Sequence, residues 1–183
     1  MTFQISVRGL NRRWAWTSLC AIGAFAVLAI LDRKLKQATG YGTIDLQRAS
    51  TADAVNLILV AWSTSRRAVL AGFNLGFDYL FMPLWGFAFF YGALALRERF
   101  APNPGTARRI MLLLCAIPLA GMLLDATENA LELSWVMQGT TDAGALLGNT
   151  VTNAKWLCLF AGLALSLAAL IGRFIPRKDQ SQA

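Results

Sequence analysis

Four long apolar runs constrain the fold of this chain more than any other feature of its sequence. They span residues 14–31, 69–96, 110–135 and 151–172. About 20 apolar residues are enough to cross a bilayer as a helix. Only 15% of the 183 residues are charged, whereas a soluble domain carries about 25%. We therefore expect an all-α polytopic membrane protein in which residues 1–183 form a single transmembrane domain, a four-helix antiparallel bundle.

The connection between the first two runs carries a further predicted helix. Ser50 and Asp53 have the spacing of a capping box. Four apolar residues then recur at helical spacing: Val55, Ile58, Leu59 and Trp62. We expect a short amphipathic helix over residues 51–62, which lies on the outer membrane surface or covers the end of the bundle.

The basic residues predict an orientation. Ten Lys or Arg residues lie in the N-terminal arm, the connection between the second and third runs, and the C-terminal tail. None lies in residues 136–150. Because cytoplasmic loops of membrane proteins are enriched in Lys and Arg, we expect both termini in the cytoplasm. The first connection, with six Lys or Arg residues, argues the other way.

Composition also narrows the chemistry. The chain has no histidine, which removes the commonest metal ligand and any His-ligated haem. Its three cysteines lie inside apolar runs and form no CxxC pair. We expect no cofactor and no metal site. The net charge of +7 comes from residues that flank the spans, so we expect membrane lipids as partners and no nucleic acid.

Polar residues within the spans are the candidate functional site. A charge there costs roughly 2.5–3.5 kcal/mol on insertion scales. The third span carries four polar residues at helical offsets of 0, 3, 4 and 7, so they share one face. All the polar residues fall in the outer half of the spans, and we expect an acidic, hydrated pocket there for a ligand. The candidates are Asn74, Asp78, Asp125, Glu128, Asn129, Glu132, Asn153 and Lys155.

Simpler interpretations stay open for each of these residues. Lys155 extends to the outer head groups or turns inward to an ion pair. Glu132 is close enough to the interface to be solvated. The asparagines could simply hold helices together by hydrogen bonds. Even the deep acids Asp78, Asp125 and Glu128 could be structural, as carboxyls hydrogen-bonded between helices.

Two short motifs resemble a known group of proteins. Gly76-Phe-Asp78-Tyr-Leu-Phe81 resembles a DFLF element, and Asp125-Ala-Thr-Glu128-Asn129-Ala130 resembles a DxxENA element. Together with the preceding helix they resemble small, uncharacterised bacterial four-span membrane proteins. The resemblance covers roughly residues 42–132. It implies a multi-pass protein of the bacterial inner membrane and no particular activity. The layout is also similar to that of four-helix EXPERA-type sterol isomerases and binders, although no EXPERA motif occurs.

Three functional hypotheses follow. The first is a pocket that binds or transports a cation, a proton or a small amphipathic ligand, because carboxylate and amide oxygens suit such ligands. The second is an intramembrane acid/base enzyme that acts on a lipid or isoprenoid. The third is an accessory or assembly subunit of a larger membrane complex. No reaction-specific motif occurs, so the enzyme question stays open and binding ranks first. A homo-oligomer is compatible with each hypothesis.

Overall fold

The computed structural model describes residues 7–175, and within that range the chain is all α-helical. It confirms the predicted class: four long apolar helices packed as a bundle, with a short helix between the first two. The helices are α1 (Val7–Thr39), α2 (Thr43–Arg48), α3 (Ala52–Thr64), α4 (Ala68–Phe100), α5 (Thr106–Gln138) and α6 (Asp142–Gly172).

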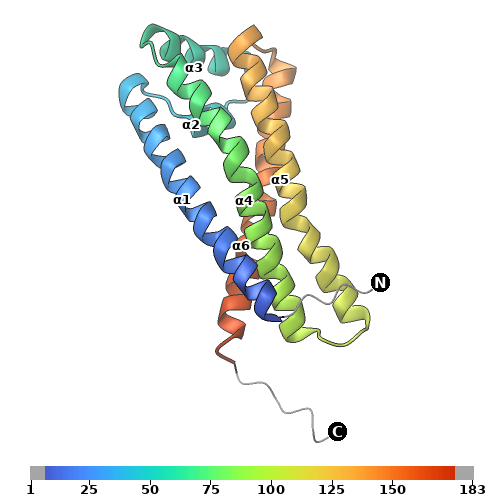
Figure 1. The fold of residues 1–183 in the computed structure, drawn as a ribbon. Helices are drawn as coiled ribbons and strands as arrows, with labels where there is room; N and C mark the ends of the chain where they lie inside the picture. The colour runs from blue at the N-terminus through green and yellow to red at the C-terminus, as the bar shows by residue number, and fades with distance from the viewer. Residues whose placement is uncertain (1–6, 176–183) are drawn as a thin grey trace, which may run out of the picture.

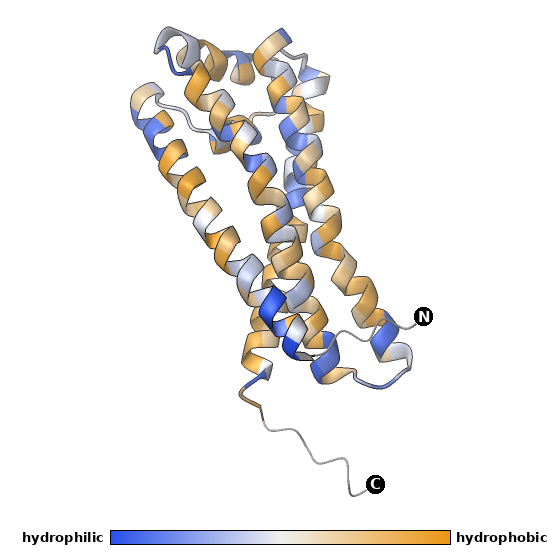
Figure 2. Cartoon of the chain, viewed as in Figure 1, coloured by the Kyte–Doolittle hydropathy of each residue, from blue (hydrophilic) through white to orange (hydrophobic). Residues whose placement is uncertain are grey.

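The helix α4 lies at the centre of the bundle, in contact with α1, α5 and α6 (Figure 1). The short helices α2 and α3 lie at the end of the bundle away from residues 7 and 175. We call this the outer end, and the end that carries residues 7 and 175 the inner end. Hydrophobic residues cover most of the length of the long helices (Figure 2), as expected for helices that face lipid.

All four long helices are long and apolar enough to cross a membrane, so the chain is a multi-pass membrane protein. They contain 31 to 33 residues, or about 45–50 Å at 1.5 Å per residue. The hydrocarbon core of a bilayer is only about 30 Å thick. The four predicted apolar runs lie inside these helices, whose ends therefore extend past the hydrocarbon core.

The outer end is closed by two short helices, of which only α3 was expected. It begins one residue later than the capping box implied, because the Thr51 hydroxyl, and not that of Ser50, accepts the Ala54 N–H at 3.3 Å. Its apolar face packs into a core with residues from α1 and α5. That core includes Leu35, Val55, Ile58, Trp62 and Trp135. The helix α3 thus covers the end of the bundle.

The helix α2 is tied to α1 and α6 by polar contacts. Asp45 accepts the Gly42 N–H at 2.8 Å and forms an ion pair with Lys36 of α1 at 2.9 Å. The side chain of Asn149 on α6 donates to the Arg48 carbonyl at 3.1 Å. The six residues of α2 have no long apolar stripe of their own, so these polar bonds fix the position of the helix.

Small residues allow the long helices to approach closely. On α6, Cys158 lies against Gly121 of α5, and Ser166 lies against Gly92 of α4. A stripe of small residues on α6 therefore packs within the chain. The Gly72 and Gly76 pair of α4 behaves differently, since a Cβ atom at either position would meet nothing within 4 Å. Packing among residues 7–175 does not explain that pair.

The Asp45 contacts give a pH prediction. Burial raises the pKa of Asp45, but the Gly42 N–H and the Lys36 ammonium together lower it by more. The pKa of Asp45 is therefore below its usual value of 3.8. A group with a lowered pKa in the folded state stabilises that state above its unfolded pKa, and the effect is lost as the pH falls through the folded pKa. Asp45→Asn should therefore lower the local stability of residues 43–48 at neutral pH by up to about 1 kcal/mol. Backbone hydrogen exchange in these residues should become correspondingly faster. The difference from wild type should shrink below pH 3.8.

Asp53→Asn is the matched control, because Asp53 is exposed on α3 and its side chain forms no hydrogen bond or ion pair with residues 7–175. Equal exchange in Asp45→Asn and Asp53→Asn at neutral pH would contradict the prediction.

Candidate functional site

One face of α5 carries four polar residues into the interior, as their spacing indicates. Asp125, Glu128, Asn129 and Glu132 are each at most 3% exposed. They occupy the outer half of the helix, and α4 and α6 pack over them. Buried polar groups need partners, because an unpaired one loses its hydration without compensation.

Lys155 of α6 is the central partner. Its ammonium lies 3.2 Å from Asp125 Oδ1 and forms a second, shorter ion pair with Glu128 Oε2. Lys155 is 4% exposed, so it turns inward and does not extend to the head groups. Position explains the choice: Lys155 lies 13 residues after the start of α6 at Asp142, about 20 Å along the helix axis. Asp125 lies 13 residues before the end of α5 at Gln138, at a matching depth.

Two neutral side chains complete this buried cluster. The Trp85 indole of α4 donates to Asp125 Oδ2 at 3.0 Å, and the Thr152 hydroxyl of α6 donates to Glu128 Oε1 at 2.7 Å. Each carboxylate therefore receives one charged and one neutral donor. The cluster joins α4, α5 and α6 through groups that have little access to water.

Asp78 of α4 belongs to a second set of hydrogen bonds, which contains no lysine or arginine. Its Oδ2 accepts the side-chain N–H of Asn129 at 2.6 Å. One turn further out, Asn74 donates to the Thr43 hydroxyl at 3.3 Å. That hydroxyl and the Thr43 N–H both donate to Asp32 Oδ1, at 2.7 and 2.6 Å. A chain of hydrogen bonds thus links α4 to α2 and α1 at the outer end.

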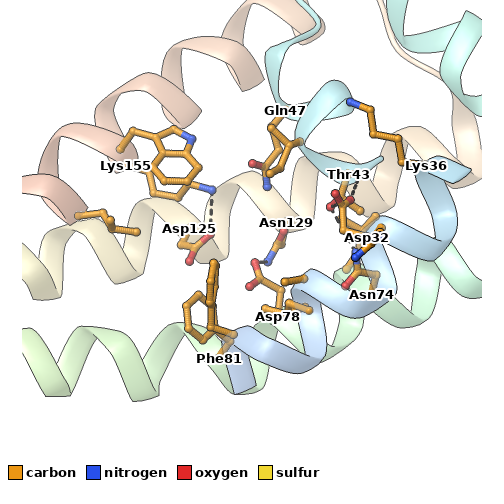
Figure 3. A pocket seen from close by; sticks show the side chains of 18 of the residues that line it. Asp32, Lys36, Thr43, Gln47, Asn74, Asp78, Phe81, Asp125, Asn129 and Lys155 are labelled. Carbon is orange, nitrogen blue, oxygen red and sulfur yellow. Dashed lines mark hydrogen bonds and ion pairs between the residues drawn. The ribbon is translucent and has the colours of Figure 1, made fainter. Parts of the chain in front are cut away.

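A cavity of about 460 Å³ lies between these two sets of contacts (Figure 3). Toward the outer end its walls are largely polar, with the apolar side chains of Ile44 and Leu75 among them. The polar residues there are Asp32, Arg33, Lys36, Gln37, Thr43, Gln47, Asn74, Asp78 and Asn129. Asp125 and Lys155 reach it at greater depth. Toward the middle of the bilayer its walls are apolar, formed by Phe25, Leu28, Phe81, Trp156 and Leu159. Its volume is in the range of small-molecule sites in proteins.

The candidate residues divide into three groups. Asn74, Asp78, Asp125, Asn129 and Lys155 line the cavity. Glu128 and Glu132 are buried beside it without lining it, and neither oxygen of Glu132 has a hydrogen-bond partner within residues 7–175.

Asn153 lies apart from the cavity. It is exposed on α6 and donates to the Asn149 side chain at 3.1 Å. Residues two apart in a helix point to nearly opposite sides, so Asn153 and Lys155 do not share a face. Thr152, at a spacing of three from Lys155, takes the inward place.

Several site residues were not among the candidates. Trp85 follows Asp78 by seven residues on the same face of α4, and this spacing could have identified it. Asp32 ends the first apolar run as a lone acid among basic residues, which was a weaker signal. Thr43 and Gln47 lie on α2, whose existence depends on contacts with α1, α4 and α6, so no local pattern marks them.

Comparison with known proteins adds no template for this site. No protein-family model, curated protein or solved structure matches the chain. The four-span part of the sequence resemblance agrees with the fold. The chemistry of the site therefore has to be argued from the residues of this chain alone.

The ion pairs of Lys155 give a stability prediction. Lys155→Met removes the one ammonium that both Asp125 and Glu128 contact, and leaves two buried carboxylates without a counter-charge. Breaking a buried ion pair in this way costs about 3–5 kcal/mol. We expect a large fall in the thermal unfolding temperature of the purified protein, measured in detergent by intrinsic tryptophan fluorescence.

A triple variant separates charge from packing. Adding Asp125→Asn and Glu128→Gln to Lys155→Met removes the unpaired charges, so most of the lost stability should return. Lys34→Met, at an exposed position of α1, is the control and should melt like wild type. If Lys155→Met itself melts like wild type, the cluster does not hold the bundle together.

Proposed function

We propose that this protein binds a small amphipathic molecule that reaches the cavity from within the bilayer. The observation that carries the proposal is the two-sided lining of the cavity, which is mostly polar toward the outer end and mostly apolar toward the membrane middle, where the ion pair of Asp125 and Lys155 is the polar exception. A lipid-like molecule with its head group at the membrane surface is likewise polar at its outer end and apolar toward the membrane middle. A hydrated metal ion would have no use for the apolar half.

The packing of α1 supports entry from the side. This helix packs chiefly on α4. At the inner end, Arg173, which follows α6, donates a hydrogen bond to Asn11 of α1 at 2.7 Å. Between these two helices the cavity is lined by Phe25 and Leu28 of α1 and by Trp156 and Leu159 of α6. We place the entrance there, where a hydrocarbon chain would meet mainly apolar side chains.

Binding is better supported than catalysis by the state of Asp125 and Glu128, the two carboxylates that contact Lys155. A general acid or base has to exchange a proton with its substrate. Asp125 and Glu128 are instead engaged with Lys155 and with neutral donors. Such a cluster can form a rigid part of the cavity wall against which a ligand binds. We therefore rank the intramembrane enzyme second.

We further propose that the protein lies in the bacterial inner membrane with its inner end in the cytoplasm. The compartment rests on the resemblance described above. The orientation rests on the basic residues of the inner end and on the absence of Lys and Arg from residues 136–150. Reporter fusions after Ala183 should be active as cytoplasmic reporters, and fusions near Gly139 as external ones. The opposite pattern would mean that the basic first connection sets the orientation.

Filling the cavity tests the binding proposal. Ala29 lines the cavity from α1, whereas Ala26 is exposed on the same helix and does not line it. In lipid nanodiscs, at least one of dodecylamine, dodecanol, dodecanoate and dodecyl phosphate should raise the unfolding temperature of the wild-type protein. Ala29→Trp should abolish this increase, because the indole occupies the cavity, and Ala26→Trp should keep it.

Two outcomes would oppose this proposal. Stabilisation by every amphiphile in both tryptophan variants would mean that the effect comes from the bilayer and not from the cavity. Purification of the protein only as part of a stable complex with another membrane protein, with the cavity empty of lipid by native mass spectrometry, would favour the accessory-subunit hypothesis.

A further inference from the structure

Three of the six charged side chains that line the cavity are paired with an opposite charge of the protein: Lys36, Asp125 and Lys155. Asp125 faces Lys155 and Trp85, and the Lys155 ammonium is shared with Glu128. Asp32 accepts two hydrogen bonds from Thr43 through one oxygen. At the outer rim, Lys36 is paired with Asp45. A ligand head group would have to displace these contacts in order to use the same charges.

Asp78 is different, and it lies deeper in the cavity than Asp32 and Arg33, the two other lining charges without an ion pair among residues 7–175. Among residues 7–175 its carboxylate has no ion pair with a basic side chain, and its hydrogen bond comes from the neutral amide of Asn129 at 2.6 Å. Only Oδ2 takes part in that bond, which leaves Oδ1 without a partner in the described chain. Figure 3 places Asp78 and Asn129 in the middle of the cavity lining, between the outer polar residues and Phe81.

The orientation of two neighbouring amides adds to this excess of acceptors. The Thr43 hydroxyl gives its proton to Asp32, so it can only accept from Asn74, which must present its NH₂ group. Asn129 must present its NH₂ group to the Asp78 carboxylate for the same reason. Both amide oxygens are left buried and without a partner in residues 7–175. The two asparagines are at most 2% exposed, so water does not replace the missing donors at the protein surface.

The unused acceptor that lines the cavity here is therefore Asp78 Oδ1, which carries a formal negative charge without an ion pair among residues 7–175. The Gln47 side-chain amide lines the cavity as well and supplies no charge. A group that supplies both hydrogen-bond donors and positive charge complements such a surface. An anionic head group would add acceptors and repulsion. A hydroxyl would supply one donor without charge.

We propose that Asp78 binds a protonated amine, which is the head group of the amphipathic ligand. This inference rests on the proposed function, which it makes more specific: the ligand is an aminolipid or another long-chain amine. The ammonium forms an ion pair with Asp78, and the hydrocarbon chain runs past Phe81 toward the membrane middle.

The test compares head groups on one hydrocarbon chain. The full-length protein in nanodiscs of neutral lipid is titrated with dodecylamine, dodecanol, dodecanoate and dodecyl phosphate, and the unfolding temperature reports binding. Wild type should bind dodecylamine at least about tenfold more tightly than dodecanol, as expected for a charge-assisted hydrogen bond in a buried site. Asp78→Asn should remove the preference for the amine while keeping the binding of dodecanol. Asp53→Asn, on the surface of α3, should leave both affinities unchanged.

The outcomes separate the inference from the proposed function. If none of the four amphiphiles stabilises wild type, both fail. If dodecanol binds as tightly as dodecylamine, the cavity binds amphiphiles but Asp78 does not select an amine. A preference for dodecyl phosphate would also overturn the inference and would move the head-group site to the exposed Arg33 and Lys36 at the rim. The comparison between head groups is made on wild type, so it holds even if Asp78→Asn does not fold.

Discussion

The arrangement of the outer half of this bundle depends on one ammonium group. Lys155 lies between Asp125 and Glu128 at a depth where none of the three charges reaches water. Without the lysine the two acids would repel each other in a medium that hardly screens them, and without the acids the lysine would be equally unstable. Satisfying all three at once fixes the register of α6 on α5. The Trp85 bond to Asp125 then brings α4 into the same register.

The cavity follows from a different constraint, the way in which α1 is attached. At the outer end this helix is connected to the rest through α2, by the bonds of Asp32 to Thr43 and of Lys36 to Asp45. A Cβ atom at Gly42 would lie 2.5 Å from an Asp32 carboxylate oxygen, so a larger residue at this junction would displace the side chain that Thr43 holds. The short helix α2 therefore fills the outer end between α1 and α6, and the space beneath it stays open.

Local periodicity explains what could be predicted from the sequence. Hydropathy located the four long helices, and the spacing of Asp125, Glu128, Asn129 and Glu132 showed that they share a face, since both properties depend only on residues a few positions apart. The inward position of Lys155 depends on a partner in another helix, so the sequence left it open. The sequence prediction also grouped Asn153 with Lys155 by depth, although a spacing of two residues puts them on opposite sides of α6. The roles of Thr43 and Gln47 arise only when α2 is packed, and no spacing rule could have shown them.

The buried face of α5 also constrains how the protein is made. Four polar side chains on a single span would cost several kcal/mol if that helix entered lipid alone. The cation that neutralises two of them lies on α6, which leaves the ribosome last of the four spans. Until α6 arrives, α5 has only Trp85 and Asp78 of α4 with which to pair. The third span is therefore expected to wait beside α4, inside or next to the insertion machinery, and to enter the bilayer together with α6 as a hairpin.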